Sequence, residues 1–454
     1  MGLTGIQIYK LLPQTNCKDC GEPTCLAFAM KLAAGKAELS KCPFVSEAAK
    51  AQLSEASAPP IRDVTLGQGD AAHKVGGETV KYRHEKTFVN PTGLAVALTN
   101  GMDAGAVDIE LKLLNDVKFE RVGFTLRPNY AFLWDQKKDQ ASFLDLVKKV
   151  TAATEKGLIV SSEDVATLKA AAELLKGKKF ALHAATTATA DQFIQFAKDF
   201  GCTVVAKGDS LEDLAAVGEK FVAAGLKEVL LDPGMFSNLR KALTDSIAIR
   251  RAALDKKFRA LGFPTLAFPC AMTNHKELQA AYASMLMDKY AGIVVLGSLD
   301  PAVVLPLVVN RLNIFTDPQR PMTMDQGIYP INNPGPGSPL IITTNFALTY
   351  FVVSAEVEAS RVPTWLLIMD TEGMSVLTAW SAGKFVADAM APFVKKSGVS
   401  EKVSHKKIII PGYVAQLSGE FQEELGEGWE VVIGTREAAD IPKFLKDYVA
   451  KHGA

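Results

Sequence analysis

Residues 158–185 read LIVSSEDVATLKAAAELLKGKKFALHAA, two short apolar runs separated by a longer amphipathic stretch. The runs at 158–162 and 180–185 have the length and composition of buried strands, and the stretch between them is typical of a helix. The same alternation recurs from about residue 60 to 325, with eight apolar runs at 95–100, 121–126, 158–162, 180–185, 203–208, 228–234, 265–270 and 292–298. Eight strands, most of them followed by a helix, predict a (β/α)8 (TIM) barrel. The region between residues 78 and 135 is ambiguous and allows an extra hairpin.

A second α/β region follows the Pro- and Gly-rich stretch 332–339, which we interpret as a domain boundary. Strands are expected at 340–345, 364–370, 407–412 and 430–434, with helices at 346–360, 375–396, 413–425 and 436–451. This alternation predicts a small doubly wound, Rossmann-like sheet. The predicted division of the 454 residues is therefore a helical module at 1–57, a barrel at 58–325 and an α/β domain at 326–454.

Four of the six cysteines lie close together, in the pattern Cys17-x2-Cys20-x4-Cys25-x16-Cys42. In a reducing compartment such a group of thiols indicates a metal site and not a disulfide framework. A [4Fe–4S] cluster needs four thiolates, and we expect these four to supply them. Cys25 is expected to begin a helix over 25–34, capped by Thr24, where the helix dipole favours a thiolate. Zinc is the alternative, although only one Cys-x2-Cys pair is present.

The remaining features of the chain exclude several classes of protein. Lys and Arg total 50 and Asp and Glu total 50, which argues against nucleic acid or an anionic membrane as a partner. Because the chain has no long uncharged apolar stretch and no secretory signal, we expect a cytoplasmic protein. Thr4 and Gln7 have the spacing of a capping box, a third helix is expected after Ser46, and residues 54–60 read as a linker. Cys202 and Cys270 stand alone and are expected to be buried thiols.

Small and hydroxylated residues gather at the predicted carboxyl ends of the four C-terminal strands, where open α/β sheets bind ligands. They are Thr343, Thr344 and Asn345 with Phe346, the loop from Asp370 to Met374, Gly412, and Gly434. Gly and Thr also cap helices in any α/β domain, which explains the pattern alone equally well. No Gly-x-Gly-x-x-Gly follows the first strand, so a nicotinamide dinucleotide is disfavoured.

The cysteine module, the barrel and the segments TTNFALTY (343–350) and DTEGMSVLTA (370–379), in this order, resemble the large (gamma) subunit of the corrinoid iron–sulfur protein. The resemblance covers the whole chain. It implies a methyl carrier of the anaerobic acetyl-CoA (Wood–Ljungdahl) pathway, acting with enzymes and not mainly as one. The cobalt of a bound cobamide would take a methyl group from methyltetrahydrofolate on a separate methyltransferase and pass it to acetyl-CoA synthase/CO dehydrogenase. The partner in the heterodimer would be the small (delta) subunit, with the cobamide between the two.

Carried over position by position, the resemblance places thirteen residues beside the corrin: Leu340, Thr343, Thr344, Asn345, Phe346, Asp370, Thr371, Glu372, Gly373, Met374, Gly412, Ile433 and Gly434. Thr371 would face the cobalt from below. The last domain has no Asp-x-His-x-x-Gly motif, and its histidines are His405 and His452. We therefore expect a base-off cobalt without a protein nitrogen ligand, which is easier to reduce. The [4Fe–4S] cluster would reactivate cobalt(II) to cobalt(I).

The barrel leaves two rival functions open. Thr99, Asn100, Asp232 and Asn274 follow predicted strands, where barrel active sites lie, and could bind a pterin. The chain would then be a methyltransferase that binds methyltetrahydrofolate itself, whereas a barrel that serves as a scaffold needs no ligand. The second rival is an electron-transfer protein whose C-terminal domain binds a flavin or nothing.

Overall fold

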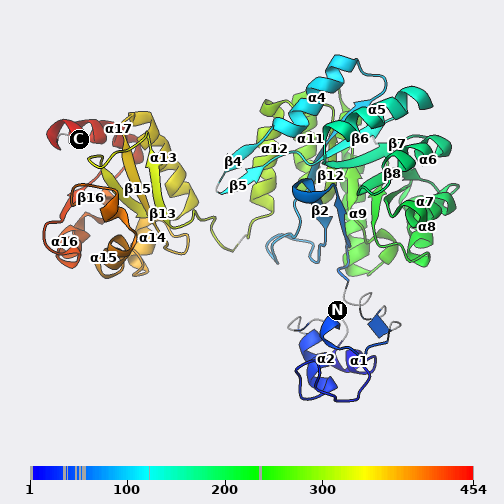
Figure 1. Cartoon of the computed structure of the whole chain (residues 1–454), viewed down its shortest axis with the longest axis horizontal. Coiled ribbons are helices and arrows are strands. Elements are labelled where there is room, and N and C mark those ends of the chain that lie inside the picture. The colour runs from blue at the N-terminus through cyan, green and yellow to red at the C-terminus, as the bar shows by residue number, and fades with distance from the viewer. Residues whose placement is uncertain are drawn as a thin grey trace. The chain divides into compact units, whose positions relative to one another are not determined.

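The computed structural model describes residues 4–33, 37, 39–46, 49–50, 53, 58–121, 123–234, 238–317 and 319–452. The chain divides into two compact units. The first consists of Met1–Lys81, Val89–Val117 and Pro128–Arg311, and the second of Tyr82–Phe88, Lys118–Arg127 and Leu312–Ala454. Figure 1 shows both units, and each is described by itself below.

The predicted barrel is confirmed: eight parallel strands close in the order β10-β11-β12-β3-β6-β7-β8-β9. The strands are β3 (Gly93–Thr99), β6 (Tyr130–Trp134), β7 (Gly157–Ser161), β8 (Phe180–Ala185), β9 (Thr203–Lys207), β10 (Val229–Asp232), β11 (Thr265–Ala267) and β12 (Ala291–Leu296). Their side chains are almost all buried because one face fills the barrel interior and the other packs under the surrounding helices.

Helices cover the outside of the barrel (Figure 1). They are α4 (Ala104–Asp116), α5 (Gln140–Ala153), α6 (Val165–Leu174), α7 (Ala190–Phe200), α8 (Leu211–Ala223), α9 (Leu239–Asp255), α11 (Lys276–Asp288) and α12 (Pro301–Ile314), with short turns at Arg259–Leu261 and α10 (Pro269–Met272). Several of these helices begin where a short polar side chain accepts a backbone N–H of the first turn. Asp103, Asp164 and Ser210 do so for α4, α6 and α8.

The second barrel strand was predicted wrongly at 121–126. That segment is part of an antiparallel hairpin, β4 (Phe119–Arg121) and β5 (Phe124–Leu126), which belongs to the second unit, and the barrel strand is β6. The reason lies in burial: the side chain of Phe124 is 52% exposed, whereas four of the five residues of β6 are buried. A further hairpin that we did not predict, β1 (Asp63–Leu66) with β2 (His73–Gly76), packs its apolar side chains into the barrel core.

The C-terminal sheet has five strands in the order β13-β15-β14-β16-β17. They are β13 (Gly327–Ile331), which is antiparallel to β15, and the parallel β14 (Leu340–Thr344), β15 (Thr364–Met369), β16 (Lys407–Ile410) and β17 (Glu430–Ile433). Alternate strand residues point to two separate cores. One core contains α13 (Ala347–Ser360) and α17 (Ile441–His452), and the other contains α14 (Val376–Ser381), α15 (Ala387–Lys396) and α16 (Ser418–Leu425). Helices therefore cover both faces of the sheet (Figure 1).

Five points in this region need correction. The helix predicted over 375–396 is two helices, since the chain turns between them at Gly383, whose φ is +70°. The helix predicted from 413 begins as a 3-10 helix, Gly412–Leu417, before α16, and the last helix begins only at Ile441. Strand β13 was missed. Residues 332–339 consequently connect two strands of one sheet, although the sequence suggested a domain boundary there.

The N-terminal module contains α1 (Gly5–Tyr9), α2 (Cys25–Ala33) and a 3-10 turn, Leu39–Lys41. The capping box of Thr4 and Gln7 is confirmed, and the hydroxyl of Thr24 accepts the backbone N–H of Ala27 at 3.1 Å, as expected of a cap. The helix predicted after Ser46 and the linker from residue 54 fall largely outside the described residues. No described helix has the length and apolar character needed to span a membrane.

Candidate functional site

The four clustered cysteines lie in the N-terminal module with different exposures. Cys25 and Cys42 are buried in its hydrophobic core, Cys20 is half-buried against the same core, and Cys17 is exposed. Asn16 fixes the loop, because its Oδ1 accepts the N–H of Cys25 at 2.8 Å and its own N–H donates to the sulfur of Cys25 at 3.4 Å. Within the described ranges, no three Cys, His, Asp or Glu side chains come together as metal ligands. Four thiols on one small module are nevertheless a donor set that fits a [4Fe–4S] cluster.

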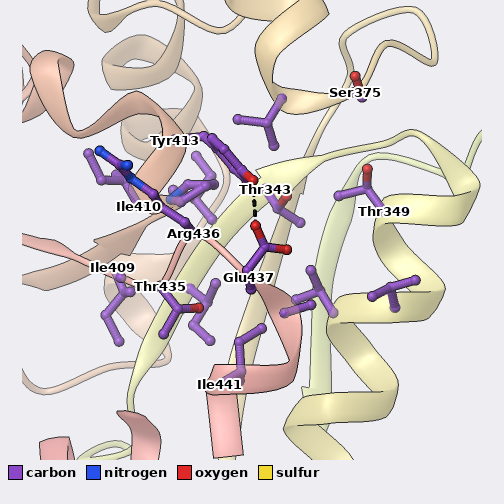
Figure 2. A pocket seen from close by; sticks show the side chains of 18 of the residues that line it. Thr343, Thr349, Ser375, Ile409, Ile410, Tyr413, Thr435, Arg436, Glu437 and Ile441 are labelled. Carbon is purple, nitrogen blue, oxygen red and sulfur yellow. Dashed lines mark hydrogen bonds between the residues drawn. The ribbon is translucent and has the colours of Figure 1, made fainter.

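A cavity of about 410 Å³ lies at the carboxyl ends of β14, β16 and β17, beside α13 and α17 (Figure 2). From β14 the chain adds β15 on one side and later β16 on the other, so the strand order reverses next to β14. Ligands of open α/β sheets bind at such a reversal. The walls are mainly apolar, with these side chains: Ile341, Ile342, Phe346, Leu348, Val352, Val353, Val376, Leu377, Ile409, Ile410, Pro411, Ile441 and Phe444.

Thr343 gives this cavity an unusual polar group. Its side chain is 1% exposed and lines the cavity, and its hydroxyl has no hydrogen-bond partner within the described structure. The hydroxyl of Thr344, at 0% exposure, is likewise unpaired there. Leaving a buried hydroxyl unsatisfied costs about 1–3 kcal/mol, so such groups usually have a partner. An unpaired hydroxyl in an apolar cavity therefore fits a ligand that brings its own donor or acceptor.

The loop after β15 is held in place by Asn345. Its buried Oδ1 accepts the N–H of Thr371 at 3.0 Å, the hydroxyl of Thr371 at 3.1 Å and the N–H of Gly373 at 3.1 Å. Its Nδ2 donates to Asp370 at 2.9 Å, and the same carboxylate oxygen accepts the N–H of Glu372. Glu372 and Gly373 both have positive φ, +55° and +75°, which the network of hydrogen bonds holds. The sequence motif Asp-Thr-Glu-Gly thus folds as one rigid turn beside the end of β14.

Two further loops meet at the cavity, after β16 and after β17. The phenol of Tyr413 donates to Oε1 of Glu437 at 2.5 Å, and both residues line the cavity (Figure 2). This hydrogen bond and the negative charge of Glu437 raise the pKa of Tyr413 above its usual value. The backbones below approach closely: a Cβ on Gly412 would lie 2.6 Å from the carbonyl oxygen of Gly434. The missing side chain of Gly412 thus admits the neighbouring loop, and its contact with a ligand stays a prediction.

Comparison with known proteins decides the family. A family model described as CO dehydrogenase/acetyl-CoA synthase delta subunit matches residues 63–445, and an Fe-S cluster model matches residues 12–44. The corrinoid/iron-sulfur protein large subunit of Moorella thermoacetica is 40% identical over 99% of this chain and 100% of its own length. Gamma subunits of the acetyl-CoA decarbonylase/synthase complex are 31% identical in Methanocaldococcus jannaschii (98% of this chain, 96% of the relative) and 34% in Methanosarcina thermophila (97% of each).

The chain belongs to the family of corrinoid/iron-sulfur protein large subunits. The family model named for the delta subunit omits the first 62 residues, whereas the large and gamma relatives match nearly the full chain. Dihydropteroate synthase of Thermus thermophilus, a solved structure, aligns over 56% of this chain and 99% of its own at TM-score 0.38 and 14% identity, too weakly to support an inference. The full-length relatives thus confirm the family resemblance that was predicted from the sequence.

Of the thirteen residues that the family resemblance placed beside the corrin, three line the cavity: Thr343, Phe346 and Gly434. Leu340 is buried in the sheet core, and Ile433 is 48% exposed at the end of the edge strand β17. The other residues lie at the ends of β14, β15 and β16, outside the cavity lining. Thr371 is fully buried, and its hydroxyl donates to the carbonyl of Met374 as well as to Asn345. Contact of these residues with a corrin stays a prediction.

Sequence reasoning missed most of the cavity wall. Leu348 and Val352 of α13 lie four residues apart on one helix face and are 61% and 43% exposed. The mainly apolar first half of α13, next to a small sheet, was a signal that this face serves as more than a solvent surface. Tyr413 and Glu437 gave no such signal, since only the fold brings residues 24 positions apart together.

Three of the four polar residues predicted at the barrel mouth, Thr99, Asn100 and Asp232, are hydrogen-bonded to residues that the sequence did not single out. Asn100 donates to Asp135 at 2.9 Å, and Ser162 donates to the other oxygen of that carboxylate at 2.9 Å. His183 lies between Ser161 and Asp232, at 2.8 Å from each. The side chains of Ser161, His183 and Asp232 are at most 5% exposed. Asn274, in contrast, is exposed and lies apart from them.

Proposed function

We propose that this chain is the large subunit of a corrinoid iron–sulfur protein and serves as a methyl carrier in the anaerobic acetyl-CoA pathway. The observation that carries the proposal is the apolar cavity at the strand reversal, with the unpaired hydroxyl of Thr343, in a chain whose full-length relative from Moorella thermoacetica is named for a corrinoid. When bound, the corrinoid supplies the cobalt that carries the methyl group, and the [4Fe–4S] cluster supplies the electron that restores reduced cobalt.

The C-terminal sheet, a Rossmann-like domain in this proposal, holds the corrinoid at its carboxyl edge. Thr343 and Phe346 bind it from the cavity wall, and the turn that Asn345 fixes, from Asp370 to Met374, supports the macrocycle. Large apolar side chains stand exposed near this edge, with Leu348 at 61%, Leu377 at 45% and Trp380 at 38% exposure. Their burial by the macrocycle and the small subunit offsets the cost of leaving them in water.

The positions of the two C-terminal histidines support a base-off cobalt. His405 precedes β16, and its Nε2 lies 2.9 Å from the carbonyl oxygen of Ser338, which precedes β14. His452 ends α17 and contacts Lys407, the first residue of β16. Both rings therefore lie at the amino ends of the strands, opposite to the cavity. Neither is placed to ligate a metal at the carboxyl edge, so cobalt takes no histidine from this domain.

The cluster is held in the module 1–57 by Cys17, Cys20, Cys25 and Cys42. The barrel 58–325 and the domain 326–454 complete the chain. The small (delta) subunit covers the corrinoid in the heterodimer. A separate methyltransferase supplies the methyl group and acetyl-CoA synthase receives it, so this chain acts with enzymes and not as one.

Metal analysis tests the proposal directly. The full chain, purified without oxygen together with its small subunit, is expected to contain cobalt and four iron atoms, and its cobalt(II) electron paramagnetic resonance should lack a nitrogen superhyperfine triplet. If the purified protein contained iron but no cobalt, the result would favour an electron-transfer protein. If the protein turned over methyltetrahydrofolate without a separate methyltransferase, the chain would itself be a methyltransferase.

Cys20→Ala tests the division of labour. The variant should lose its iron and its reductive reactivation, while methyl transfer by chemically pre-reduced protein survives. Cys202→Ala is the matched control, because Cys202 is a buried thiol of the barrel unit and should keep the iron. If the pre-reduced Cys20→Ala protein transferred no methyl group, the cluster would have a role in every turnover.

A further inference from the structure

The Tyr413–Glu437 pair bridges two walls of the cavity. Tyr413 comes from the 3-10 helix after β16 and Glu437 from the loop after β17, and a hydrogen bond of 2.5 Å joins them (Figure 2). The exposure of the three residues differs: Tyr413 is 42% exposed and Glu437 is exposed as well, whereas Thr343 is 1% exposed. The bridge is therefore at the open side of the cavity, and the unpaired hydroxyl is inside.

The backbone beneath the bridge is fixed. The N–H of Gly412 donates to the carbonyl of Thr435 at 2.9 Å, and the N–H of Gly434 donates to the carbonyl of Ile410 at 2.8 Å. A Cβ on Gly412 would also meet three backbone atoms within 3.0 Å, so the two loops are packed without spare room. The bridge therefore opens by rotation of the two side chains, and the hydrogen bond between Tyr413 and Glu437 is the main interaction that must break.

We propose that Tyr413 and Glu437 form a latch over the cavity, which controls how fast the cofactor enters and leaves. The inference rests on the proposed corrinoid function. The pair is a positioning device: it closes the exposed side over whatever part of the corrinoid occupies the cavity. A hydrogen bond to a carboxylate, partly exposed to water, corresponds to about a five- to tenfold change in the fraction of open molecules. Weakening it should accelerate loading and release by the same factor.

Tyr413→Phe keeps the ring and removes only the hydroxyl. Tyr329→Phe is its matched control, since the phenol of Tyr329 donates to the carbonyl of Asp325 at 2.7 Å in the same sheet but away from the cavity. The experiment uses the full chain with its small subunit under anaerobic conditions. Loading of cobamide and its release on dilution are followed by visible absorbance after rapid desalting.

Tyr413→Phe is expected to load and release cobamide about five- to tenfold faster, with a Kd within about twofold of wild type, while Tyr329→Phe matches wild type. Glu437→Gln should lie between the two, and the double variant should equal Tyr413→Phe because one bond is removed in both. Unchanged rates would overturn the latch. A raised Kd without faster loading would also overturn it, since that result describes a direct contact with the cofactor. Wild-type protein that binds no cobamide would overturn the proposed function itself.

Discussion

Asn345→Asp is the sharpest test of how the candidate site is built. The substitution keeps the shape of the side chain and the oxygen that accepts the N–H groups of Thr371 and Gly373. It replaces the Nδ2 group, which donates to Asp370 at 2.9 Å, by an oxygen. The variant would therefore place two carboxylates against each other at the end of β14.

The size of the effect follows from that distance. Two unit charges 2.9 Å apart at an effective dielectric constant of about 20 repel each other by about 6 kcal/mol. The pair avoids this by binding a proton, so the pKa of one carboxyl rises above its value in the unfolded chain. A raised acid pKa gives stability that is present at low pH and lost as pH rises through the shifted value, by about 1.4 kcal/mol per unit. Asp370 is exposed to water, and screening reduces the repulsion to about half. We therefore expect near wild-type stability at about pH 4 and a loss of about 3 kcal/mol at pH 8.

Urea unfolding at both pH values measures this loss. Three of the four tryptophans, Trp365, Trp380 and Trp429, lie in the second unit, so fluorescence reports mainly on the sheet that carries the site. Asn345→Ala is the control: it removes the acceptor as well and should lose about 2–4 kcal/mol at either pH. Equal stability of Asn345→Asp and wild type at pH 8 would refute the account of this turn.

Two other substitutions and one labelling experiment probe the packing. Gly412→Ala should lower the free energy of unfolding by about 1–3 kcal/mol in the same assay, because its Cβ would meet backbone atoms within 3.0 Å. Gly419→Ala is the control: this residue lies in α16 with open space around it, so its free energy of unfolding should be unchanged or rise by up to about 1 kcal/mol. Comparable values for the two variants would contradict the close approach at Gly412. Burial raises the pKa of the Cys202 and Cys270 thiols to about 12, so fewer of them are thiolates at pH 8. Iodoacetamide should therefore label the exposed, cluster-free Cys17 first, the half-buried Cys270 more slowly and the buried Cys202 only on unfolding. Labelling of Cys202 in the folded protein would show that this thiol is not buried as described.

Periodicity was sufficient to predict the barrel and most of the C-terminal strands, because each buried strand is a short apolar run between amphipathic helices. It failed at 121–126, where an apolar run of the right length turned out to be a hairpin. Hydrophobic character alone does not say which core a segment joins. Arg121 shows the difference: its guanidinium lies 5.0 Å from the ring centre of Phe351 in α13, a contact that no local pattern reveals.

The candidate site divides in the same way. The Asp-Thr-Glu-Gly motif and the Thr-Thr-Asn end of β14 could be recognised because they are contiguous and follow predicted strands. The cavity wall could not, since Tyr413 and Glu437 meet only through the parallel pairing of β16 and β17. A glycine at position 412 indicates close approach, and only the structure shows that one such neighbour is the backbone of the loop after β17.

Hydrogen-bond satisfaction separates the two places where this chain could have bound a small molecule. At the barrel mouth the buried carboxylates are already paired, Asp135 with Asn100 and Ser162, and Asp232 with His183. A ligand there would have to replace those bonds and would gain little by doing so. At the end of β14, in contrast, two buried hydroxyls have no partner within the described structure, and one of them belongs to Thr343, which lines an apolar cavity. A ligand that covered this apolar lining would gain free energy without breaking hydrogen bonds that already exist, so the C-terminal sheet is the better candidate for a binding site.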